Sequence, residues 1–127
     1  RVSERRDAVT MLVFAEPAGR LLKDIAQCHQ VAAVFSQPTT NRTLQIKGRD
    51  VRIAPAGPAD LALVRRYLAL FAEELRPLGW DASFVHGVFW HEGGGLTALH
   101  FTPEGAFQQT PGPGAGAALC LNREGGP

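Results

Sequence analysis

The most constraining stretch of the chain is TLQIKGRDVRI, residues 43–53, in which apolar and polar residues alternate on both sides of a glycine. Leu44 and Ile46 have the same parity before Gly48, and Val51 and Ile53 resume the alternation after it with the opposite parity. Because side chains of a strand alternate between its two faces, one extra residue at Gly48 accounts for the switch. The pattern predicts a long strand with a β-bulge or a close backbone approach at this glycine.

Four other apolar runs predict further strands, at 8–15, 31–36, 82–90 and 96–101. The run at 31–36 is short and continuously apolar, which predicts a strand buried on both faces. HEGGG joins the last two runs, and its three glycines predict a hairpin between them.

Two stretches show helical spacing instead. In 17–29, Leu21, Leu22 and Ile25 form an apolar stripe, and Pro17 suits the first turn. A longer helix is expected at about 59–76, with Pro58 at its start, Asp60 in its first turn and Pro77 and Gly79 at its end. Its apolar stripe consists of Leu61, Val64, Leu68, Phe71 and Leu75.

The expected element order is β-α-β-β-α-β-β, with hairpin connections between strands. It predicts a mainly β, antiparallel small barrel with two helices packed outside it or across its open end. A chain of 127 residues, 45% of them hydrophobic, predicts one domain over 1–127, with 111–127 as a Gly/Pro-rich C-terminal tail.

Charge and cysteine content exclude several function classes. The net charge is +1, which calls for neither a nucleic acid nor an acidic membrane partner, and no run approaches the roughly 20 apolar residues of a membrane span. The two cysteines form no CxxC motif; Cys28 is expected to be a buried helix thiol, without a disulfide to Cys120. No signal peptide is visible in the charged segment RVSERRD, and together with the composition this predicts a cytoplasmic protein.

No P-loop, GxGxxG, HExxH or GxSxG motif is present. A hairpin at the glycines would set His86 diagonally across from His100, but His86 and His91 have opposite parity on a strand, so no metal site is expected. Thr43, Gln45 and Lys47 share one strand face. That face is either ordinary solvated surface or a ligand groove, where Gln offers a donor and an acceptor and Lys neutralises a phosphate.

The stretch VAAVFSQPTTNRTLQIKGRDVRI resembles the core of the pyridoxamine 5′-phosphate oxidase-like family, the FMN-binding split barrels. The shared pattern is an apolar strand ending in Ala-x-x-Phe (Ala32 to Phe35), a polar turn, and an alternating strand ending at Gly48. The resemblance extends from about Val9 to about Thr110. It implies a split β-barrel of about six strands, a homodimer with FMN at its interface, and an oxidoreductase acting on a small-molecule substrate.

The same resemblance implies the cofactor contacts. The Ser-x-Lys pair that holds the FMN phosphate in the oxidases aligns with Gly19 and Leu21, so that Arg20 or Lys23 is expected to replace its cation. Thr43 and Gln45 stand where the oxidases place Gln and Arg against the flavin. Arg42 and Lys47 are further expected phosphate partners, and Gln109 and Thr110 are expected to reach a ligand at the interface. The family's early strand is missing or altered, since only RVSERRD precedes the first expected strand.

The departure from the family's phosphate-binding motif leaves an alternative open. Loss of the Ser-x-Lys pair is also consistent with a non-catalytic split-barrel dimer that binds haem or a deazaflavin, or that serves as a structural or stress-related module.

In the loop QTPGPGAG, Pro111 and Pro113 each remove an N–H that a phosphate cradle would use. The loop is therefore expected to lead the chain out of the barrel on an extended and turned path.

Overall fold

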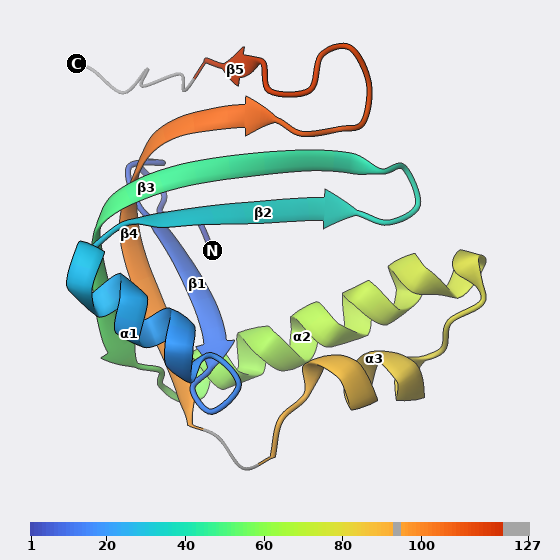
Figure 1. The fold of residues 1–127 in the computed structure, drawn as a ribbon. Helices are drawn as coiled ribbons and strands as arrows, with labels where there is room; N and C mark the ends of the chain where they lie inside the picture. The colour runs from blue at the N-terminus through green and yellow to red at the C-terminus, as the bar shows by residue number, and fades with distance from the viewer. Residues whose placement is uncertain (93–94, 121–127) are drawn as a thin grey trace.

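The structure, a computed structural model, describes residues 1–92 and 95–120. Its strands form one curled antiparallel sheet resembling half of a barrel, with three α-helices beside it (Figure 1). The elements in chain order are β1 (Val9–Phe14), α1 (Gly19–Cys28), β2 (Val31–Gln37), β3 (Arg42–Pro55), α2 (Pro58–Leu75), the 3-10 helix η1 (Arg76–Leu78), α3 (Ala82–Phe89), β4 (Leu96–Gln108) and β5 (Ala118–Leu119). The mainly β, antiparallel class expected from the sequence is confirmed.

The strand order is β1-β4-β3-β2, and β5 pairs with the end of β4. The two central strands change register twice. Between Lys47 and Gly48 the extra residue belongs to β4, and between Arg49 and Arg52 it belongs to β3, where Asp50 has a φ of 54°. The irregularity predicted at Gly48 is confirmed, but the extra residue of β3 lies just beyond that glycine. Bulges of this kind bend a strand, and here they accompany the curl of the sheet.

Gly48 is a site of close approach. It is buried, and an ideal Cβ built on it would overlap the ring of Phe101, which is itself only 2% exposed. The aromatic ring therefore occupies the space that any other residue at position 48 would fill. Around this contact lies the main core, which consists of Val9, Ile25, Ala33, Val51, Leu99 and Phe101.

We call the sheet face that carries these core residues the inner face and the opposite one the outer face. Helix α1 covers the inner face: Ile25 is 3% exposed within the core, and Leu22 packs against it. The helix ends at Cys28, and the C-cap residue His29 has a left-handed conformation (φ 53°) that turns the chain into β2. Pro17, expected in the first helical turn, instead lies in the turn before α1.

Strand β2 is not buried on both faces, contrary to the sequence expectation. Of its residues only Ala33 is buried, whereas Val34 and Phe35 are 57% and 43% exposed. The reason is topological, because β2 is the last strand on its side of the sheet and pairs with β3 alone. A continuous apolar run cannot distinguish a central strand from an edge strand with unpartnered apolar side chains.

Residues 82–89 form helix α3, and the strand and glycine hairpin expected there are wrong. Asp81 caps the helix, its carboxylate accepting from the backbone N–H of Phe84 at 2.9 Å. Strand β4 pairs instead with β1 and β3. His86 therefore lies on a helix, while His100 lies on β4 opposite Thr10, and the two are not cross-strand neighbours. Gly93 and Gly94 of the expected hairpin are outside the described residues.

Helix α2 begins at Pro58 and ends at Leu75, close to the predicted bounds. It packs mainly on α3, and the two helices extend away from the sheet beneath the β2–β3 hairpin (Figure 1). Its predicted stripe is accordingly only half-buried except at Leu75. We call the segment 58–89, which contains α2, η1 and α3, the helical arm. Several of its large apolar side chains are exposed, namely Tyr67, Leu70, Leu78, Trp80, Val88 and Phe89.

Three smaller features complete the fold. Residues before β1 fold back onto it, with Val2 opposite Val9 in an antiparallel bridge, so the segment before the first expected strand is part of the sheet edge. Cys28 and Cys120 are free and exposed, which corrects the expectation of a buried Cys28. Among the helices of residues 1–92 and 95–120, none has the length and apolar character needed to cross a membrane.

Replacing Gly48 with Ala should lower the free energy of unfolding by about 1–3 kcal/mol, because the added methyl overlaps a buried ring. Urea unfolding of the variant measures this. Gly19→Ala is the matched control: nothing lies within 4 Å of its Cβ position at the start of α1, so alanine there should be neutral or stabilising. Equal stabilities of wild type and Gly48→Ala would contradict the close approach.

Replacing Asp81 with Ala should lower Tm at neutral pH, because α3 loses its N-cap. Hydrogen bonds from the Ser83 hydroxyl and the Phe84 amide hold the pKa of this carboxyl below its usual value. Because the pKa of this carboxyl is lower in the folded state than in the unfolded state, where it is near 3.8, the ionised group stabilises the fold at pH values above 3.8. This stabilisation disappears as the pH falls through the folded-state pKa. The Tm difference from wild type should thus shrink below about pH 4.

Asp81→Asn is the companion variant in this thermal scan, because asparagine caps without titrating. It should remain close to wild type at pH 7. A Tm for Asp81→Ala equal to that of wild type at pH 7 would show that the cap does not hold α3.

Candidate functional site

The candidate site is the outer face of β3 near its start, where Thr43, Gln45 and Lys47 point the same way; we call these three residues the polar strand face. The intervening residues Leu44 and Ile46 face the core side, opposite β2 residues of the inner face. The predicted sharing of one face by the three polar residues is confirmed. Lys47 is exposed and the other two are half-buried.

Small or flat apolar side chains border the polar strand face. In register with Gln45 and Lys47 lie the residues Val34 and Ala32 of β2 and Phe107 and Gly105 of β4. A Cβ at Gly105 would lie 3.1–3.3 Å from the Phe107 ring, so that glycine gives the ring room. The Nζ of Lys47 is 4.9 Å from the centroid of the same ring, a cation–π distance. These apolar or small residues and the polar strand face between them form a strip, with Lys47 at one end and its ammonium group against the Phe107 ring.

A hydrogen-bonded cluster closes the other end of the strip. The Oγ1 of Thr43 is 3.0 Å from the Oγ of Ser36. The backbone N–H of Thr43 donates to the Oγ1 of Thr110 at 3.0 Å, and its carbonyl accepts from the N–H of Gln109 at 2.8 Å. The segment after β4 is therefore fastened to the start of β3. This brings two residues predicted from the loop, Gln109 and Thr110, beside the polar strand face.

The loop that follows turns back instead of leaving the barrel. The N–H of Gly116 donates to the carbonyl of Gln108 at 2.6 Å, and the N–H of Gln108 donates to the carbonyl of Ala117 at 2.9 Å. Gly112 and Gly116 have φ values of 143° and 87°, which favour glycine. The turned path expected from the sequence is thus a closed hairpin that pairs β5 with β4; residues 121–127 of the expected tail lie outside the described residues.

The structure separates the predicted cations. Arg20 and Lys23 are exposed on α1, which packs on the inner face, so they lie across the sheet from Thr43 and Gln45. Arg42 is exposed at the first position of β3, opposite Gln37, with inner-face parity. Of the four cations proposed for a phosphate, only Lys47 lies on the polar strand face.

Arg49 continues that face beyond Lys47, but acidic neighbours compensate its charge. Its Nε lies 3.2 Å from Glu104 and 3.6 Å from Asp50. Sequence reasoning also missed two uncharged residues of the site, Ser36 and Phe107. Ser36 could have been found from the hairpin, because it pairs with Thr43 across the turn. Phe107 could have been found by continuing the strand expected at 96–101 beyond Pro103.

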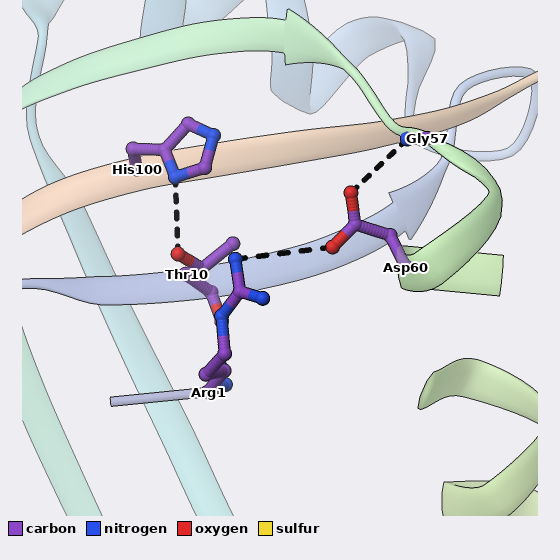
Figure 2. A network of polar contacts seen from close by, with 5 residues as sticks. All are labelled: Arg1, Thr10, Gly57, Asp60 and His100. Atoms are coloured by element: carbon purple, nitrogen blue, oxygen red, sulfur yellow. Dashed lines mark hydrogen bonds and ion pairs between the residues drawn. The ribbon is translucent and has the colours of Figure 1, made fainter. Parts of the chain in front are cut away.

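A second polar network lies farther along the outer face and holds the start of α2 against β1. Figure 2 shows Thr10 bonded to His100, with Oγ1 and Nδ1 3.0 Å apart, and Asp60 accepting from the N–H of Gly57 at 3.0 Å. Arg1 approaches Asp60 at 3.9 Å. The first-turn role predicted for Asp60 is confirmed. The amino group of Arg1 also donates to the carbonyl of Thr10, so the contacts run without a break from His100 to Gly57. Because the polar groups of these residues bind one another, we interpret the network as structural.

The tip of the β2–β3 hairpin is tied to the helical arm. Glu74 of α2 accepts hydrogen bonds from the hydroxyl and the backbone N–H of Thr39. The hydroxyl contact is the main reason why the pKa of the Glu74 carboxyl is lowered. This contact sets the position of the hairpin that carries the polar strand face relative to α2.

In the described part of the chain, no three His, Cys, Asp or Glu side chains come together around a common point. Comparison of the sequence with protein-family models and with curated proteins, and of the fold with solved structures, gave no match.

Proposed function

We propose that the protein binds FMN against the polar strand face and acts as a flavin-dependent oxidoreductase on a small-molecule substrate. The observation that carries the proposal is a strip in which apolar or small residues flank hydrogen-bonding side chains, with a cation at its end. The resemblance of residues 31–53 to the FMN-binding split barrels supports the same assignment.

The residues present fit a flavin. Ala32, Val34 and Gly105 are small enough for a planar ring to lie flat on the strands. The Gln45 amide offers both a donor and an acceptor, which suits the alternating N–H and C=O groups of a flavin edge. Lys47 is the cation proposed to neutralise the phosphate, and its ammonium group lies against the Phe107 ring.

The flavin supplies the redox chemistry when bound, by accepting and releasing a hydride. The chain's own residues orient it. The hydrogen bonds between Thr43, Thr110 and Gln109 fix the strand and loop that border the ring, so that their polar groups need little reordering on binding.

We propose further that a second copy of the chain covers this face. An open strip leaves one side of a bound ring in water, and the exposed apolar side chains of β2 and of the helical arm give a partner apolar surface to bury. In such a homodimer Arg20, Lys23 and Arg42 reach the cofactor only if they come from the other copy, because in one chain they lie away from the polar strand face.

Titration of the purified protein with FMN, followed by quenching of flavin fluorescence, tests the function. Gln45→Leu removes the amide from the ring edge and should weaken FMN binding roughly 5–30-fold, the equivalent of about 1–2 kcal/mol. Lys47→Ala should weaken FMN more than riboflavin, which lacks the phosphate.

Lys23→Ala tests the contribution of the other copy, since within one chain this cation lies on the far side of the sheet. A loss equal to that of Lys47→Ala would show that α1 of the other copy shares the phosphate, and no loss would leave Lys47 as its cation. Thermal shifts with haem or a deazaflavin, and none with FMN, would favour the alternative of a non-catalytic module. No binding of FMN by the wild type would refute the proposal.

A further inference from the structure

A cavity of about 600 Å³ opens on the opposite end of the sheet from the polar strand face. It lies where the end of β1, the start of α2 and the segment after α3 meet. Its lining residues are Phe14, Ala56, Gly57, Pro58, Leu61, Trp90, His91, Glu92 and Leu96. The cavity shares no residue with the proposed flavin site, so binding at the two sites can be tested separately.

The apolar wall of this cavity is held in place by aromatic contacts. Phe14 meets Trp90 edge to face, with ring centroids 5.6 Å apart and planes at 72°. The Trp90 ring also contacts His86, stacked at 5.5 Å between centroids, and Arg65, whose guanidinium carbon lies 5.8 Å from the ring centroid. Edge-to-face pairs of this kind favour a fixed arrangement, so the ring surface offered to a ligand exists before binding.

The rim of the cavity is acidic. His91 contributes its Nε2 to a 2.6 Å contact with one carboxylate oxygen of Glu16, the exposed residue that follows β1. Glu92, which follows His91 in the chain, is an acidic residue of the cavity lining. The third nearby acid, Asp60, is engaged with Gly57 and Arg1. Glu16 and Glu92 give the rim two acidic side chains, so it favours ligands that carry hydrogen-bond donors or a positive charge.

We propose that this cavity binds a small aromatic amine. The aromatic ring fills the space between Phe14, Trp90 and Leu61, where edge and face contacts with the two aromatic residues add to apolar burial. The ammonium group lies at the rim against Glu16 and Glu92. An aromatic acid of the same shape is disfavoured, because its carboxylate would face the same two acidic side chains.

The test uses 2-phenylethylamine and phenylacetate, two probes of similar shape and opposite charge. The chain has two tryptophans, so the Trp80→Phe background leaves Trp90 as the fluorescent reporter. In the Trp80→Phe variant, 2-phenylethylamine should cause a saturable change in the Trp90 emission. Phenylacetate should bind at least about 5-fold more weakly. Equal affinities, or no saturable response to the amine, would overturn the proposal.

Glu16→Gln in the same background keeps the shape of the side chain and removes its charge, and should weaken the amine about 3–10-fold. Glu73→Gln is the matched control on the surface of α2, where its partner is Arg76, and should leave the affinity unchanged. Ala56→Phe fills the cavity from its lining and should abolish the response. Undiminished binding in both Glu16→Gln and Ala56→Phe would place the amine elsewhere and refute the site.

Discussion

The pairing of β3 with β4 is the interaction on which the rest of the structure depends. These strands are 14 and 13 residues long, and each serves two regions of the molecule. One end of the pair carries the core beneath α1, and the other carries the polar strand face and the returning loop. The close approach of Phe101 to Gly48 lies where the two regions join, beside the register shifts that accompany the bend. The relative orientation of core and candidate site therefore rests on a contact that only glycine permits.

Features that depend on local pattern could be predicted from the sequence. The parity switch in residues 43–53 revealed the bulged strand, and the apolar stripe of 59–76 revealed α2, with Asp60 in its first turn. Alternation alone placed Thr43, Gln45 and Lys47 on a single face. In each case the signal is a spacing within one element, which the chain expresses wherever that element lies in the fold.

Features that depend on topology could not be predicted. The run at 82–90 is apolar without clear period, and its helical state is decided by the Asp81 cap and by packing on α2. The exposure of β2 follows from its place at the sheet edge. The separation of Arg20 and Lys23 from the polar strand face follows from the choice of face on which α1 packs, a long-range outcome that no local spacing encodes.

We propose that the curled sheet is one half of a functional unit that a second copy completes. Sedimentation velocity of the purified protein at low micromolar concentration tests this most directly. A single dimeric species, retained when FMN is added, is the predicted result. A stable monomer with the 13.7 kDa mass of one chain, both with and without FMN, would contradict it.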